Sequence, residues 1–327
     1  MKSSDPIRPS SRRGASGAWN RLKPVREDLL ETYGLPSKGE TRLNDFKTQE
    51  TYFNRIIERY MKLCALNREE LNILFASISS THSASTPSTT IPSNLTASFS
   101  SLALSKHAPK PPPPPPSTPP STTIPPNALT PSINELSTVL SSLRKLREAI
   151  TASNRCDAFA LRAYFFAIHV SILCADWSSY LPALHALLSK LHPRNPLPPH
   201  DLREYVGLLI LDQCCRQSDY AGARATKLFY GYRDWRVEGV MHALVQDNWT
   251  QFWRLKRGVD GYQRAVMGWA EKGVRVHVLK CVGRGYLSVD RAWLESVTER
   301  AWEELVQDGV GWELVGDKVI IRKPKGS

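Results

Sequence analysis

The sequence predicts a mainly α-helical protein, an irregular, solenoid-like array of helical repeats followed by a C-terminal winged helix with a short β-hairpin. Three observations predict this fold class. Apolar residues recur at helical spacing from Ile133 onward. Eight of the nine tryptophans lie between Trp177 and Trp312, which places the large core in that half of the chain. Near the end, two short apolar runs flank Gly316-Asp317, as strands flank a tight turn.

Composition and charge exclude several classes of protein. The chain has 327 residues, enough for about two domains, and its formal net charge of +12 permits an acidic partner without identifying one. The longest apolar run near the middle, Tyr205 to Leu211, is far shorter than the about 20 residues that span a bilayer, so no membrane partner is expected. Residues 1–14 are polar and basic, unlike a secretory signal. Six dispersed cysteines indicate a reduced chain of the cytoplasm, the nucleus or both.

The N-terminal part begins with two contrasting segments. Residues 1–45 are interpreted as a flexible basic arm, because the first 26 residues hold seven basic side chains and one acidic one. Residues 46–76 are predicted to be an amphipathic helical segment. Its apolar residues, Phe53, Ile56 and Tyr60 among them, recur at helical spacing and therefore need a surface on which to dock.

A linker is predicted over residues 77–132. Of these 56 residues, 37 are Ser, Thr or Pro and none is Asp or Glu, so the segment cannot bury enough apolar area to offset its ordering entropy. Six consecutive prolines begin at Pro111 and favour a polyproline II spacer. A ligand for a proline-binding groove is the alternative interpretation.

Residues 133–272 are assigned to the helical array. Asp201 is expected to open one helix, with Glu204 three residues later completing a capping box. Another helix is expected to start at Ser218-Asp219. The remaining helices are expected around residues 136–146, 159–172, 181–191, 237–245, 249–256 and 261–270.

The last segment, residues 273–327, is assigned to the winged helix and a basic tail. Val274, Val276 and Val278 alternate with polar residues, a local pattern that favours a strand. Beyond it, residues 290–297 and 299–308 are predicted to be helices. The strands expected after them are residues 312–315 and 318–322.

Residues 233–319 resemble the PCI family, and most closely its small subgroup with the smallest signalosome subunit, a small proteasome-lid subunit and the k subunit of the third eukaryotic initiation factor. The resembling pieces are residues 243–253, residues 275–289, and Gly311-Trp312-Glu313-Leu314 with Val319-Ile320-Ile321. In that family the second piece is a helix that feeds the winged helix. The resemblance therefore implies a helix over Gly273 to Gly285, against its periodicity.

One departure from the subgroup concerns the end of the chain. The lid and signalosome relatives carry a helix after the wing, whereas five residues follow Arg322 here, so that helix is not expected. A second PCI branch, the proteins of nuclear mRNA export and processing, is the rival. Residues 54–63 are weakly similar to a segment upstream of the PCI region in that branch.

No reactive motif is found, so we expect no enzyme, no cofactor, no metal and no small-molecule substrate. His185 and His192 lie seven positions apart without a third ligand, which favours surface or capping histidines over a metal site. The adjacent Cys214 and Cys215 are expected to be buried or half-buried thiols. Capping or solvation is the expected role of three acidic residues near helix ends or faces: Asp157, Asp176 and Asp212.

The first functional hypothesis is a non-catalytic PCI scaffold that binds other PCI or helical-repeat subunits. The residues expected to form the hairpin core and the edge of the winged helix are Trp312, Val319, Ile320 and Ile321. The alternative is an RNA-associated adaptor, with weak contacts through the arm (Arg8, Arg12, Arg13, Arg21, Lys23, Arg26) and the wing (Lys318, Arg322, Lys323, Lys325). Groove reading by residues 299–308 is disfavoured, because four acidic side chains there outnumber Arg300.

Overall fold

The computed structural model describes residues 29–68, 71, 75 and 130–322. These residues are mainly helical, with a small three-stranded antiparallel sheet near the C-terminus, so the predicted mainly α class is confirmed. Within the described residues, no helix is long and apolar enough to cross a membrane. Most of the predicted arm and nearly all of the predicted linker lie outside the described residues.

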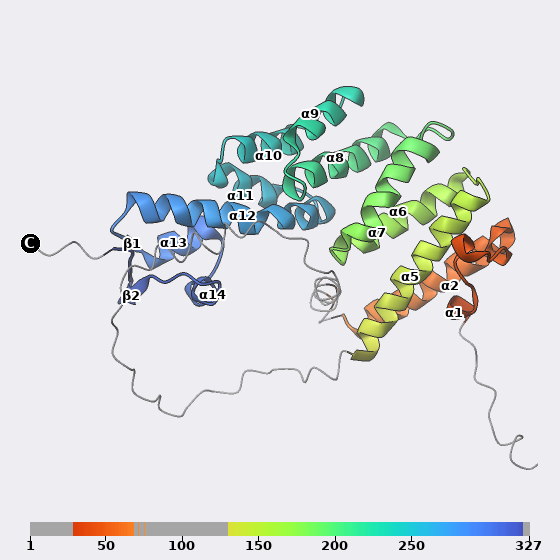
Figure 1. Ribbon diagram of the computed structural model, residues 1–327, viewed down its shortest axis with the longest axis horizontal. Helices are drawn as coiled ribbons and strands as arrows, with labels where there is room; N and C mark the ends of the chain where they lie inside the picture. Colours follow the sequence, from red (N-terminus) through yellow and green to blue (C-terminus); the bar gives the residue numbers. More distant parts are fainter. Residues whose placement is uncertain (1–28, 69–70, 72–74, 76–129, 323–327) are drawn as a thin grey trace, which may run out of the picture.

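The helices run in sequence from one end of the molecule to the other, with α1 and α2 far from the C-terminal sheet (Figure 1). The N-terminal elements are α1 (Leu29–Thr32), the 3-10 turns η2 (Pro36–Lys38) and η3 (Arg42–Asn44), and α2 (Phe46–Leu66). The central elements are α5 (Thr130–Ala152), α6 (Ala158–Leu173), α7 (Trp177–Ala186), the π-helical turn η4 (Leu187–Leu191), α8 (Pro199–Cys215), α9 (Tyr220–Phe229), α10 (Trp235–Val245) and α11 (Trp249–Gly258). The C-terminal elements are α12 (Gly261–Gly285), β1 (Ser288–Asp290), α13 (Arg291–Thr298), α14 (Trp302–Gln307), β2 (Glu313–Val315) and β3 (Lys318–Ile320).

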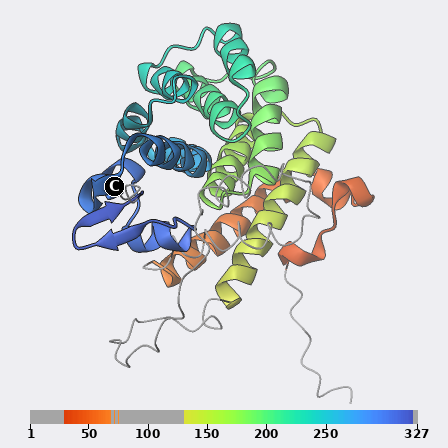
Figure 2. The same ribbon diagram turned by 60° about the vertical axis from the view of Figure 1, so that its left-hand side comes forward.

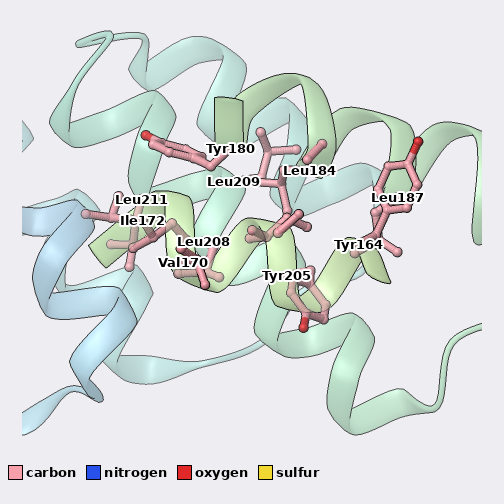
Figure 3. Packing of buried hydrophobic residues seen from close by; sticks show 14 of the residues in the cluster. Tyr164, Val170, Ile172, Tyr180, Leu184, Leu187, Tyr205, Leu208, Leu209 and Leu211 are labelled. Atoms are coloured by element: carbon pink, nitrogen blue, oxygen red, sulfur yellow. The ribbon is translucent and has the colours of Figure 1, made fainter. Parts of the chain in front are cut away.

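Neighbouring helices pack in pairs along the array. The principal pairs are α2 with α5, α6 with α7, α8 with α9, and α10 with α11, while α12 lies against α8. One buried apolar cluster runs from Leu30 to Ala270. Its central part joins side chains of α6, α7 and α8, including Tyr164, Tyr180 and Tyr205 (Figure 3).

The amphipathic segment docks on the array as its pattern predicted. Asp45 caps α2 by accepting a hydrogen bond from the Thr48 N–H, at 2.9 Å. Phe53 and Ile56 are buried, and the Phe53 ring meets the Phe159 ring edge-on at 5.5 Å. The surface that covers the apolar face of α2 therefore belongs to α5 and α6, on the far side of the predicted linker.

The expected capping box at Asp201 is wrong. Helix α8 begins two residues earlier, at Pro199, and its N-cap Pro198 makes no side-chain capping bond. A proline at the first helical position has no N–H to satisfy and a φ suited to a helix, so the helix can start there. Glu204 instead forms a hydrogen bond with His169 of α6, with 2.9 Å between the His169 Nε2 and the Glu204 Oε1.

Residues 273–285 are helical, as the family resemblance implied and against the local alternation. They continue α12 from Gly261 without a break, so the expected boundary between residues 272 and 273 falls inside a helix. Arg275, Val278, Leu279 and Val282 are buried, which is the three-to-four spacing of a helix face. The alternation of valines therefore does not mark a strand. The first half of α12 packs into the cluster that runs from Leu30 to Ala270, and its second half packs into a separate cluster near the C-terminus.

The C-terminal unit, residues 278–321, has its own apolar cluster around Val289, Leu294, Trp302 and Val319. The sheet order is β1-β3-β2, so β3 is the central strand. Val319 is paired with Val289 on one side and with Leu314 on the other. The predicted hairpin β2–β3 is confirmed, and Gly316 turns it with a φ of +61°, whereas β1 was not expected.

Candidate docking surfaces

The four residues predicted to form the hairpin core and the edge of the winged helix lie in or beside the β2–β3 hairpin. Val319 is fully buried, and Ile320, Ile321 and Trp312 are half-buried. The Ile321 N–H donates to the Leu287 carbonyl at 2.9 Å. The burial of Val319 agrees with a place in the hairpin core, and β3 is a central strand, because a third strand, β1, pairs with the side of β3 that a two-stranded hairpin would leave open.

The outer edges of the sheet belong to β1 and β2. Among the described residues, neither strand has a second partner strand. Exposed apolar side chains gather at both: Leu287 is 57% exposed and Val315 58% exposed. Beside Leu287, the Tyr286 and Trp293 rings touch, with centroids 5.6 Å apart. We call these residues together the sheet-edge surface; Tyr286, Leu287 and Trp293 lie beside β1, and Val315 lies on β2 at the opposite edge.

A second apolar surface lies where α9 turns into α10. Leu228, Phe229 and Trp235 are 71%, 81% and 72% exposed, although each is large and apolar. We call these three residues the corner surface. The Lys227–Glu238 ion pair, at 2.7 Å, joins the two helices beneath it. Figure 2 shows α9 and α10 (teal) projecting away from α2 and α5. Clusters of exposed large apolar residues are typical of protein–protein contact sites.

Most of the cations that were candidates for RNA contact lie outside the described residues. These are the six arm residues, Arg8, Arg12, Arg13, Arg21, Lys23 and Arg26, and the tail residues Lys323 and Lys325. Lys318 is exposed on β3. Arg322 is exposed too, but its Nη2 donates to the Gly283 carbonyl at 2.7 Å and so helps to hold the sheet on α12.

The acidic helix is shorter than expected and its carboxylates are paired. Residue Glu299 closes α13 with a φ of +51°, and α14 covers Trp302–Gln307 only. Arg291 lies 2.8 Å from Glu303, and Arg300 lies 2.7 Å from Glu304 and 3.7 Å from Asp308. Glu299 pairs with Arg257. Neighbouring arginines therefore offset part of the negative charge of this segment, and α14 itself offers no cation to a phosphate.

Glu295 links α13 to the start of α14. Its Oε1 accepts hydrogen bonds from the Trp302 N–H at 2.8 Å and from the Arg291 guanidinium at 2.9 Å. These donors favour the ionised carboxylate and lower the pKa of Glu295, the arginine having the larger effect. Because the N-cap Ala301 has no capping side chain, Glu295 performs that task from the preceding helix.

We expect Glu295→Ala to lower the free energy of unfolding of the C-terminal unit by about 1 kcal/mol, as loss of an N-cap does. The contribution of the ionised carboxylate is present above its ordinary pKa and is lost as the pH falls through the lowered folded pKa, so the difference from wild type shrinks in acid. Urea unfolding at several pH values measures both effects. Glu303→Ala is the control, since it removes the other partner of Arg291 without touching the cap; an equal loss in both variants would contradict the capping role.

One Cys–His–Asp arrangement was missed by the sequence analysis. On α12, the Cys281 Sγ lies 3.3 Å from the His277 Nε2, and the His277 Nδ1 lies 4.0 Å from a carboxylate oxygen of Asp247. A thiol beside an imidazole is the chemistry of a nucleophile. The cavity beside His277 holds only about 20 Å³, room for about one water molecule, and Cys281 does not line it.

The other reactive side chains have structural roles. The His192 Nδ1 accepts the Leu197 N–H at 3.0 Å, and His185 is exposed. Burial raises the pKa of the Cys214 thiol to about 12, and burial also raises the pKa of the Cys215 thiol. Within the described part of the chain, no group of three or more His, Cys, Asp or Glu residues is placed to hold a metal ion.

Comparison with known proteins adds no relative. Neither a scan against protein-family models nor a search of curated proteins finds a match to this chain.

Proposed function

We propose that this chain is a non-catalytic scaffold or adaptor subunit of the PCI type, which assembles with other subunits in a complex of the proteasome-lid, signalosome or initiation-factor kind. The observation that carries the proposal is the order of elements at the C-terminus. The second half of α12, then β1, α13, α14, β2 and β3 follow one another as helix, strand, helix, helix, strand and strand. That order, with the sheet arranged β1-β3-β2, is the one a winged helix requires.

The helices before α12 support the helical-repeat part of the proposed PCI type. Successive helices pack as pairs, α6 with α7, α8 with α9 and α10 with α11, and α12 then closes on α8. Pairs of helices stacked in sequence are the unit of a helical-repeat array. Their unequal lengths agree with an irregular array that has no strict sequence period.

The apolar residues exposed on the C-terminal unit and on the helical array favour binding to other proteins. The sheet-edge surface offers the outer edges of β1 and β2 beside apolar side chains, a combination that accepts a strand of another protein. The corner surface offers a second apolar binding site, at the turn between α9 and α10. In this proposal, the sheet edge binds the corresponding unit of another PCI subunit, and the corner surface binds a helical-repeat neighbour.

We expect the double variant Leu287→Ser with Val315→Ser to lower recovery of a PCI partner by at least about tenfold, because truncating buried interface anchors costs about 1–2 kcal/mol each. The measurement is cross-linking of the tagged chain in its source cell, followed by identification of the peptides joined to residues 286–315. Leu66→Ser is the matched control, since Leu66 is 84% exposed on α2, outside both surfaces.

Two outcomes would contradict the proposal. One is recovery of no PCI or helical-repeat protein by the wild-type chain. The other is an equal loss of partner in the control variant and in the sheet-edge variant. Recovery of RNA in place of protein, lost steeply as salt is raised, would favour the adaptor alternative.

A further inference from the structure

An open cavity of about 670 Å³ lies where α5, α7 and η4 meet the short 3-10 turn at Pro36, away from both docking surfaces. Three cations line it: Arg144 and Arg147 of α5, and Lys190 of η4. The lining has one carboxylate, that of Glu148. Cavities of this size are typical of sites for small ligands or for a single modified side chain.

The protein does not fully satisfy Arg147. Its Nε is buried and has no hydrogen-bond partner among the described residues. Burial also lowers the pKa of Arg147, which indicates that neighbouring carboxylates do not fully offset the loss of water. The charge of an anion bound in the cavity would offset part of that loss.

The nearby carboxylates are engaged elsewhere. The Glu148 Oε1 accepts from Arg144 at 3.2 Å, and its Oε2 accepts from the Ser37 hydroxyl at 2.9 Å. Asp176, which also attracts Arg147 through space, accepts from the Ser178 hydroxyl at 2.6 Å. Glu148 thus neutralises Arg144, and the charges of Arg147 and Lys190 are the ones that face an incoming anion.

The rest of the lining adds one neutral donor, the Ser179 hydroxyl. Ser178 and Ser179 stand in the first turn of the ten-residue helix α7, whose N-terminal end carries partial positive charge. The Ser178 hydroxyl already donates to Asp176. The Tyr164 and Thr151 hydroxyls lie 3.1 Å apart, and the Thr151 hydroxyl donates to the Arg147 carbonyl, so both are engaged within the protein. A guanidinium, an ammonium and a hydroxyl suit a group with three acceptor oxygens and about two negative charges better than they suit a carboxylate.

We propose that this cavity binds a phosphate monoester, with Arg147 and Lys190 holding the phosphate oxygens and Ser179 of α7 completing the site. The cavity is larger than a phosphate ion, so it has room for the group to which the phosphate is esterified. That group is either a small metabolite or a phosphorylated serine or threonine side chain. The inference is independent of the proposed scaffold function.

The test is calorimetric titration of the full chain with O-phosphoserine, and with a peptide of residues 82–90 phosphorylated at Thr86. Saturable binding is expected, at about millimolar dissociation constant or tighter for O-phosphoserine, and weakening about tenfold or more in Arg147→Gln and in Lys190→Gln. Stronger binding of the peptide than of O-phosphoserine would identify a protein source of the phosphate, and the reverse would identify a small molecule.

Arg224→Gln is the matched control, because Arg224 is exposed on α9 and its loss changes the net charge equally. Lys190 is exposed, so Lys190→Gln tests the site even if the Arg147 variant does not fold. If neither O-phosphoserine nor the phosphopeptide binds saturably, the proposal is overturned. Equal weakening in Arg224→Gln and in Lys190→Gln would also overturn it, because binding would then follow the net charge alone.

Discussion

Arg155→Ala is expected to lower the free energy of unfolding by about 3 kcal/mol and to release α2 from the rest of the array. Arg155 follows α5, and its side chain is only 3% exposed. It donates to the Phe46 carbonyl at 2.9 Å and to the Gln49 Oε1 at 3.3 Å, and it forms ion pairs with Glu50 and Asp157. One guanidinium therefore fastens the first turn of α2 to the start of α6.

The size of the effect follows from the kinds of contact that are lost. Hydrogen bonds that involve a charged group contribute about 1.5–3 kcal/mol. The Arg155 guanidinium also lies 4.4 Å and 4.1 Å from the ring centroids of Phe46 and Phe159, so packing and cation–π attraction are lost as well. Glu50 and Asp157 are about half exposed and regain water, which keeps the loss below that of a fully buried pair.

Urea unfolding measures the free energy, and hydrogen exchange measures the release of α2. The amides of residues 46–66 should lose protection in the variant while those of α8 keep theirs. Arg55→Ala is the control, because it removes only an exposed ion pair with Glu58 on the same helix and should cost less than about 0.5 kcal/mol. Wild-type protection of α2 in Arg155→Ala would show that apolar packing alone holds the helix.

The helices were predictable from the sequence because apolar spacing is a local property. Helix α2 was expected from residues such as Phe53 and Ile56, and Asp219 was placed at the start of α9, where it accepts the Gly222 N–H at 2.8 Å. Residues 273–285 are the informative exception. There the local alternation favoured a strand, and the helix was obtained only from a likeness to a family.

Structural features that depend on residues far apart in the sequence could not be predicted. Strand β1 has three residues and one buried side chain, Val289, so it is too short for its alternation to be recognised, and it exists through pairing with β3 thirty positions later. Without β1, the terminal strand was taken for an edge. The pairing of Arg155 with Glu50, 105 positions away, is likewise invisible to any local pattern. The cavity around Arg147 joins residues of η2, α5, α6, α7 and η4 and has no sequence signature.

The role expected for Asp212 from the sequence is wrong. Capping or solvation was expected, yet the residue is fully buried in α8. Both carboxylate oxygens accept from Arg216, at 2.7 Å and 2.8 Å, and Gln217 donates at 2.7 Å. The Tyr180 hydroxyl of α7 donates to the same carboxylate. Burial, followed by the charge of Asp212, raises the pKa of Tyr180, which keeps the phenol a donor at physiological pH.

Asp212→Ala is expected to lower the free energy of unfolding by about 3–5 kcal/mol, because it leaves the Arg216 charge and the buried Tyr180 hydroxyl without their acceptor. Asp212→Asn should cost less, since its amide oxygen still accepts one of these bonds. Tyr180→Phe in the Asp212→Ala background should then recover part of the loss, as no phenol is left unsatisfied. Asp201→Ala, at a partly exposed position of the same helix, is the control. Losses in the two alanine variants that agree within about 0.5 kcal/mol would mean that the network contributes nothing beyond the loss of a helical carboxylate.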